Sequence, residues 1–137
     1  MTATLTKPYP QPRETPENAT YLRGWRSGKL MLQRCACCDR AVFYPRPMCP
    51  HCWSDSLLWD EAGGVGTVVS FSLVRRPNHP VFNDEVPIVL AEILLEENVA
   101  MLARVLDGIP TIGARVVLAS DPETVKRYPL PAFRLAP

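Results

Sequence analysis

The chain has 137 residues, of which 47% are hydrophobic and 21% charged, and its formal net charge is +1. These values describe an ordinary soluble globular protein of one domain or two small lobes. The longest apolar run, residues 86–95, contains Glu92 and is too short to span a bilayer. Residues 1–20 lack the apolar segment of a secretory signal, so we expect a cytoplasmic protein with reduced cysteines.

The N-terminal part of the chain predicts a flexible arm followed by a short helix. Residues 1–14 show no periodicity and contain three prolines, which favours an arm that is flexible or orders only on a partner. A helix is predicted over residues 15–29, with Thr15 as its N-cap, Pro16 in its first turn and Gly28 near its end. Its apolar face consists of Ala19, Tyr21, Leu22 and Trp25. Because so short a helix is marginal in water, this face should dock on the rest of the chain or on a partner.

Residues 30–61 predict a zinc ribbon. Two Cys-x2-Cys pairs, separated by ten residues, supply the ligand set Cys35, Cys38, Cys49 and Cys52. Each pair presents two thiolates to one side of a metal ion, and Zn²⁺ prefers four such ligands in a tetrahedron. Short strands are predicted at residues 30–34, 41–44 and 57–61. We therefore expect one structural Zn²⁺ per chain, without an open coordination position for chemistry.

Other readings of the cysteine-rich segment are less favoured. Cys37 lies inside the first pair and is expected to be a bystander, because Cys35 and Cys38 repeat the spacing of the second pair. His51, inside the second pair, is expected to be exposed and not a ligand. A disulfide framework remains an alternative, but five cysteines in a reducing compartment favour four ligands and one spare thiol.

Residues 62–137 predict a five-stranded β-barrel of the OB type. The strands are expected at residues 67–74, 88–95, 99–106, 115–119 and 133–135. Glycine-rich and proline-rich turns separate them, which is typical of a small barrel. The last strand is short and bounded by prolines, and is expected at an edge. The glycines at 63–66 indicate a turn or bulge and not a dinucleotide site, because no helix follows them.

With these elements placed, the chain resembles a family of acyl-CoA-associated proteins. Its members join an N-terminal helix, a rubredoxin-like zinc ribbon and a C-terminal OB-fold. The resemblance runs from about residue 16 to 135 and rests on the order and spacing of several motifs. These are Tyr21-Leu22-x-Gly24-Trp25-x-x-Gly28-x-Leu30, Cys35-x2-Cys38, Phe43-Tyr44-Pro45-Arg46, Cys49-Pro50-x-Cys52, Gly64-x-Gly66-Thr67-Val68-x-Ser70-Phe71, His79-Pro80-x-Phe82, Val86-Pro87-Ile88-Val89-x-Ala91 and Leu130-Pro131-x-Phe133-Arg134.

The resemblance implies a function carried out with a partner. Proteins of the family that this chain resembles look like non-catalytic subunits, and they assemble with thiolase-type enzymes or acyl-CoA hydratases. They are thought to help hold or channel the CoA thioester. By this resemblance we expect a hetero-oligomer with a thiolase-like or hydratase-like subunit, and an acyl-CoA as ligand.

The chain departs from the family pattern after each Cys pair. Glycine usually follows the second cysteine of such a turn, where positive φ is common, but here Asp39 and Trp53 occupy these positions. Asp tolerates positive φ, whereas Trp should be strained by about 1 kcal/mol. Either the second turn has a different shape, or the Trp53 ring contacts a partner.

Candidate CoA contacts are predicted in the loop at residues 75–84. His79 and Phe82 are expected to lie near a thioester with Arg75 and Arg76, whose guanidinium groups suit CoA phosphates. The alternatives are a loop histidine that bonds to its own backbone and a pair of surface arginines. No nucleophile with a partnered base is evident, so catalysis by this chain alone is not expected.

Two further functions stay open from the sequence. Zinc ribbons and OB-folds also occur in nucleic-acid-binding proteins, so nucleic-acid binding is the alternative function. It would require a basic groove with stacking aromatic side chains and would give a steeply salt-dependent affinity. Residues 61–137, with seven basic against nine acidic side chains, argue against it. A free acyl-CoA carrier without an enzyme partner is the third possibility.

Overall fold

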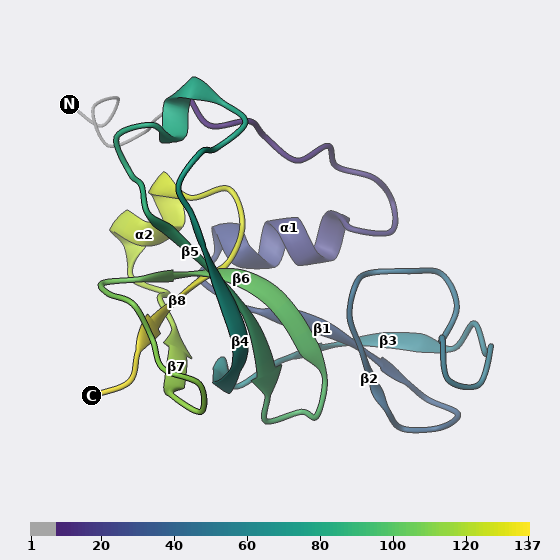
Figure 1. Cartoon of the computed structure of the whole chain (residues 1–137). Helices are drawn as coiled ribbons and strands as arrows, with labels where there is room; N and C mark the ends of the chain where they lie inside the picture. The colour runs from purple at the N-terminus through teal and green to yellow at the C-terminus, as the bar shows by residue number, and fades with distance from the viewer. Residues whose placement is uncertain (1–7) are drawn as a thin grey trace.

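The computed structural model describes residues 8–137, which form a β-barrel with a three-stranded ribbon to one side (Figure 1). The barrel strands are β4 (Val65–Val74), β5 (Ile88–Leu95), β6 (Ala100–Leu106), β7 (Arg115–Leu118) and β8 (Ala132–Leu135). The ribbon strands are β1 (Met31–Cys35), β2 (Ala41–Val42) and β3 (Leu57–Glu61). Helices α1 (Ala19–Arg26) and α2 (Pro122–Arg127) and the 3-10 turn η2 (Pro80–Phe82) complete the elements. The predicted mainly β fold, with a helix, a ribbon and a barrel, is confirmed.

The barrel closes in the strand order β4-β5-β6-β8-β7, as expected for a five-stranded OB-fold. Strand β8 pairs in parallel with β6 and antiparallel with β7. The expectation of an edge strand at residues 133–135 is therefore wrong, because closure of the barrel places this strand between two neighbours. Phe133 on β8 is completely buried in the core.

One hydrophobic core joins the barrel to α1 and to the base of the ribbon. It contains Leu22 of α1 and Leu32 of β1 together with barrel residues such as Ile93 and Phe133. Alternate residues of β5 and β6 are buried, as expected for strands that present one face to a core. The outer end of the ribbon is different, because its separate buried cluster consists only of Cys35, Val42 and Cys49.

Helix α1 begins four residues later than predicted. Thr15 and Asn18 form a turn before it, in which the Thr15 N–H donates to the Asn18 side chain at 2.7 Å and the Asn18 N–H donates to Thr15 Oγ1 at 3.3 Å. Asn18 is the residue at the N-cap. The Thr-Pro signal therefore marks the turn that leads into the helix and not the first residue of the helix.

Helix α2 was not predicted, although its sequence carries a start signal. Asp121 caps it by accepting from the Thr124 N–H at 3.1 Å, and Pro122 takes the first position. Among the described residues, no helix has the length and apolar character needed to cross a membrane.

The predicted N-terminal arm lies partly outside the described residues, which exclude residues 1–7. Within residues 8–14, Tyr9 is only 4% exposed. Its ring stacks between Phe82 and Tyr128, with centroid separations of 5.3 and 5.8 Å. This part of the arm is therefore held against η2 and the segment that follows α2.

Candidate metal centre and apolar pocket

The four predicted cysteine ligands converge at the outer end of the ribbon. The Sγ atoms of Cys35, Cys38, Cys49 and Cys52 all lie within 4.8 Å of one another. The Cys35–Cys52 and Cys38–Cys49 Sγ separations are 3.5 and 3.7 Å. A tetrahedral site with bonds of about 2.3 Å places its sulfur atoms about 3.8 Å apart, so the arrangement fits one Zn²⁺. Within residues 8–137, neither Cys37 nor His51 belongs to this group.

The two Cys turns have the same backbone geometry. The Asp39 N–H donates to the Cys35 carbonyl at 2.8 Å, and the Trp53 N–H donates to the Cys49 carbonyl at 2.9 Å. Asp39 and Trp53 have φ values of 63° and 66°. The second turn therefore has the ordinary shape despite its tryptophan, which removes the first of the two explanations offered for Trp53.

Backbone N–H groups also favour thiolates at this centre. The Cys38 N–H donates to Cys35 Sγ at 3.5 Å and, together with the Cys37 N–H and the neighbouring thiols, lowers the pKa of the Cys35 thiol to about 6. For Cys52, the hydrogen bond from the Ser54 N–H is outweighed by partial loss of water around the sulfur and by the neighbouring thiols, so the pKa of Cys52 rises to about 12. Four neighbouring thiolates repel one another, and a bound cation is what allows all four to lose their protons.

Replacing Trp53 with glycine is expected to stabilise the protein. The Trp53 side chain is 73% exposed, so it loses little burial, while glycine adopts positive φ without strain. The gain should be about 1 kcal/mol in the free energy of unfolding, measured by urea denaturation of the metal-loaded protein. Asp39→Gly is the matched control and should gain less, because Asp tolerates this conformation. A destabilised Trp53→Gly variant would show that the ring packs within the free chain.

Of the four predicted CoA contacts, His79 and Phe82 lie together, with their rings edge to face and their centroids 6.2 Å apart. Arg75 and Arg76 are exposed in the loop after β4. His79 Nδ1 accepts from the Val81 N–H at 3.1 Å and so caps η2. Phe82 stacks on Tyr9, and both line the apolar pocket described next. The CoA contacts predicted for all four residues stay predictions.

An apolar pocket of about 340 Å³ lies where the N-terminal segment, the ribbon and the barrel meet. This volume falls in the range of small-molecule sites, roughly 300–1,000 Å³. Its walls come from segments far apart in the sequence. They are Tyr9, Tyr21, Phe43, Tyr44, Phe82, Leu90, Leu102, Ala103, Arg104, Tyr128, Pro129, Leu130, Pro131 and Ala132. Sequence reasoning missed this pocket, because only the tertiary fold brings these side chains together.

A buried ionic cluster supports one wall of the apolar pocket. The Glu85 side chain is 6% exposed and pairs with Arg104 at 2.7 Å and with Arg127 at 3.6 Å. The Tyr9 hydroxyl donates to Glu85 at 2.5 Å. Burial, together with this hydrogen bond, raises the pKa of Tyr9 above its ordinary value. Arg104 and Arg127 also lie against the Tyr128 ring, at 5.1 and 5.3 Å. The cluster thus ties the N-terminal segment to β6 and α2.

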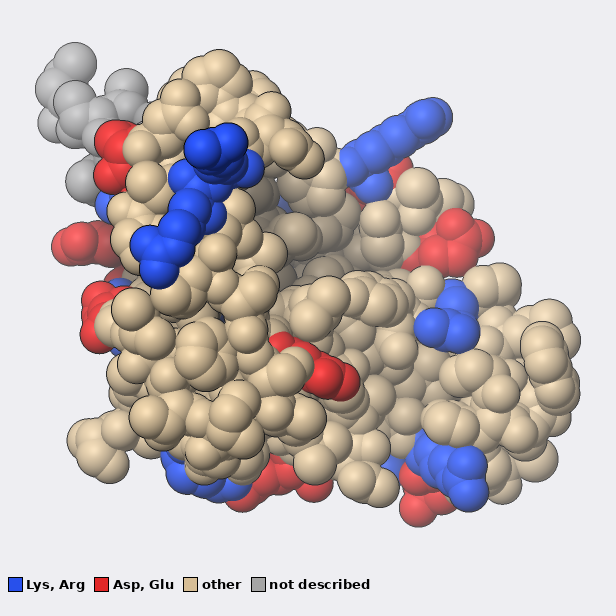
Figure 2. Space-filling model, in the orientation of Figure 1, with Lys and Arg blue, Asp and Glu red and all other residues tan. Residues whose placement is uncertain are grey.

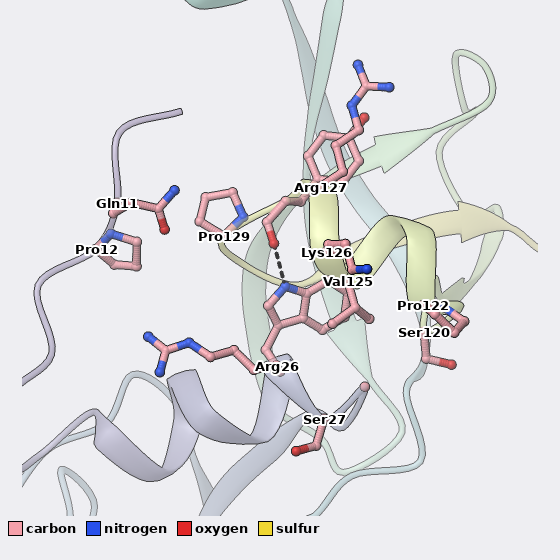
Figure 3. Close-up of a pocket in the computed structure, with 13 residues that line it drawn as sticks. Gln11, Pro12, Arg26, Ser27, Ser120, Pro122, Val125, Lys126, Arg127 and Pro129 are labelled. Carbon is pink, nitrogen blue, oxygen red and sulfur yellow. Dashed lines mark hydrogen bonds between the residues drawn. The ribbon is translucent and has the colours of Figure 1, made fainter. Parts of the chain in front are cut away.

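A second, larger cavity of about 610 Å³ lies between α1 and α2 (Figure 3). The Trp25 indole is part of the lining and donates to the Tyr128 carbonyl at 2.8 Å, which is the dashed line in Figure 3. Arg26 projects toward Gln11 and Pro12, whereas Arg127 projects away from them. Lys126 contributes another positive charge to the lining. Tyr128 and Pro129 line both this cavity and the apolar pocket.

The charges on the visible face do not form one continuous basic stripe. In Figure 2, basic side chains stand singly or in small groups, separated by uncharged surface and interspersed with acidic ones. A nucleic-acid-binding groove would require a clustered basic surface. The face seen in Figure 2 does not present such a surface.

Comparison with known proteins gives two adjoining matches to family models. The ChsH2 rubredoxin-like zinc ribbon domain matches residues 23–57, and the ChsH2 C-terminal OB-fold domain matches residues 59–120. The solved structure of an Ltp2-ChsH2(DUF35) aldolase is 34% identical, with a TM-score of 0.75. That alignment covers 93% of this chain and all of the other chain.

Two more relatives differ in what they show. A protein of Thermomonospora curvata, named as a probable enoyl-CoA hydratase alpha subunit, is 36% identical over 135 residues. This alignment covers 93% of the present chain but spans only 40% of that relative's length. A DUF35-family structure from Sulfolobus solfataricus, of unknown function, is 18% identical with a TM-score of 0.63. The alignment covers 88% of the present chain and 86% of the chain in that structure. At this identity it shows a likeness of fold alone.

Proposed function

Because this chain belongs to the ChsH2 family of zinc-ribbon and OB-fold proteins, we propose that it is a non-catalytic subunit of an acyl-CoA-converting enzyme. It binds a thiolase-like acyltransferase or an acyl-CoA hydratase and helps to hold the CoA thioester. The single observation that carries the proposal is the 34% identity over the whole of a chain from an Ltp2-ChsH2(DUF35) aldolase. The hydratase-subunit name of the Thermomonospora curvata relative points to the same class of enzyme.

The geometry supports a binding role better than a catalytic one. The four thiols are grouped closely enough to fill every position of a tetrahedral ion, which would leave no open position for a substrate at the metal. His79 is engaged with its own backbone at Val81. In contrast, the apolar pocket offers a site for a ligand at the junction of the helix, the ribbon and the barrel.

We further propose that the ion is one structural Zn²⁺ per chain, held by Cys35, Cys38, Cys49 and Cys52. Four thiolates are the ligand set of structural zinc sites, and the matching family model is a zinc ribbon. When bound, the ion cross-links the two Cys turns and supplies no reaction chemistry.

Purification of the native complex and reconstitution test the proposed function. The chain should copurify with one acyl-CoA enzyme subunit, identified by mass spectrometry, and the two purified proteins should form the complex again when mixed. The chain alone should not convert acyl-CoA, whereas the mixture should. A chain that remains a monomer in native extracts, or that turns over acyl-CoA by itself, would contradict the proposal.

A further inference from the structure

We infer that Trp53 is the anchor by which the zinc ribbon docks on the partner enzyme, with its indole ring seated in an apolar recess of that subunit. This inference rests on the proposed function and adds the surface of this chain that holds the enzyme. The partner must therefore offer a concave, uncharged surface large enough for one indole ring.

The conformation of Trp53 has no explanation within the free chain. Its φ of 66° lies in the left-handed region, which a bulky side chain adopts only with strain, and the residue is 73% exposed. Burial of the ring therefore does not offset the strain. Asp39 holds the same place in the first Cys turn with a φ of 63°, so the turn itself needs no aromatic ring. Strained residues of this kind cluster at functional sites.

The backbone around Trp53 is held on both sides. The preceding residue, Cys52, belongs to the group of four converging thiols. The Trp53 N–H donates to the Cys49 carbonyl at 2.9 Å, and the Cys49 N–H donates to the carbonyl of Ser54, the next residue, at 2.8 Å. A side chain on a backbone fixed in this way loses little freedom when it is bound. Tryptophan is also among the residues that contribute most to the affinity of protein interfaces.

The outer end of the ribbon exposes larger apolar side chains than it buries. Tyr44 and Met48, from the segment between the two Cys pairs, are 52% and 44% exposed, and Trp53 is the third. The buried cluster at this end has one aliphatic member, Val42, with the partly buried Leu57 packed against it. A bound metal supplies the stability that a larger core would otherwise give. The large apolar side chains are therefore free to face a partner.

A protein subunit is the occupant that these features favour. The ribbon projects to one side of the barrel, so its outer end can meet a neighbour without displacing other elements (Figure 1). Trp53 lines neither of the cavities described above, so a small molecule bound in them would leave its ring uncovered. Residues 36–56 contain two arginines and two aspartates, without the positive excess that nucleic-acid binding requires. An uncharged recess of the enzyme subunit is the complementary surface.

Fluorine NMR of the metal-loaded full chain, labelled with 5-fluorotryptophan, tests the contact directly. The chain has three tryptophans, of which Trp25 is buried and Trp59 is partly buried, and Trp53→Phe identifies the third resonance by its absence. The unlabelled enzyme subunit, isolated from the native complex, should shift the Trp53 resonance and shield it from solvent. The other two resonances should stay in place. A Trp53 resonance that remains solvent-accessible in the complex would overturn the inference.

Calorimetric titration with the same enzyme subunit separates docking from folding. Trp53→Gly should weaken binding roughly thirtyfold, as expected for an interface hot spot, although it stabilises the free chain. A purely structural role would move stability and affinity in the same direction. Trp53→Phe should recover most of the lost affinity, because a smaller ring still enters the recess. Asp39→Gly, at the matching position of the first Cys turn, should leave the affinity unchanged. Equal losses in Trp53→Gly and Asp39→Gly would contradict the anchor role.

The outcomes also distinguish this inference from the proposed function. If the enzyme subunit binds the chain and Trp53→Gly binds it equally well, the docking surface is wrong and the subunit role stands. If no enzyme subunit binds the unaltered chain, both are wrong. If the Trp53 resonance is already shielded in the free chain and sedimentation shows a dimer, a second copy covers the ring and the inference fails.

Discussion

Replacing Cys49 with serine is expected to abolish metal binding and to unfold the outer end of the ribbon while the barrel remains folded. The buried cluster at this end is small: it consists of Cys35, Val42 and Cys49, with the partly buried Cys38 and Leu57 packed against it. One buried aliphatic side chain contributes about 1.5–3 kcal/mol. Structural zinc contributes about 10–16 kcal/mol in small zinc-binding peptides. The metal must therefore supply most of the stability of this segment.

Elemental analysis and amide hydrogen exchange measure this effect. The metal content should fall from about one ion per chain to nearly none, and residues 36–56 should lose protection while β5 and β6 keep theirs. A chelator should reproduce the result. Cys37→Ser is the matched control, since Cys37 is exposed and lies outside the group of four Sγ atoms. Loss of metal from Cys37→Ser, or full metal content in Cys49→Ser, would show that the ligand set is different.

The metal centre could be predicted because its signal is local. Two Cys-x2-Cys turns within eighteen residues determine the chemistry of the site, whatever the rest of the chain does. The barrel strands could be predicted for a related reason. Alternating apolar residues and glycine-rich turns are local sequence patterns that indicate strands and their ends. The position of β8 between β6 and β7 could not be predicted. The sequence of a strand does not indicate which strands it pairs with across the barrel.

The two cavities could not be predicted from the sequence. Tyr9 lies among prolines without periodicity, yet it is buried between Phe82 and Tyr128. Its partner Glu85 is 76 residues away. Arg75 and Arg76 are adjacent in the sequence, whereas Arg104 and Arg127 meet only through the fold, at Glu85. A site built from long-range contacts carries little local signal.

Replacing Glu85 with alanine is expected to lower the free energy of unfolding by about 3–5 kcal/mol, an effect typical of breaking a buried ion pair from one side. The substitution leaves Arg104, whose side chain is 18% exposed, without its partner at 2.7 Å. It also removes the acceptor of the Tyr9 hydroxyl. Urea denaturation of the metal-loaded protein measures the loss. Because the same carboxylate joins the N-terminal segment to β6 and α2, the wall between the two cavities should loosen as well.

A surface ion pair on the same barrel provides the control. Glu96 pairs with Arg115 at 2.8 Å, but these side chains are 59% and 51% exposed. Glu96→Ala should therefore change the free energy of unfolding by only about 0–1 kcal/mol.

Tyr9→Phe separates the two contributions of Glu85, because it keeps the stacked ring and removes only the hydroxyl donor. Its cost should be about 1 kcal/mol. If Glu85→Ala costs no more than Tyr9→Phe, the arginines find water or other partners, and the cluster is not what holds the N-terminal segment against the barrel.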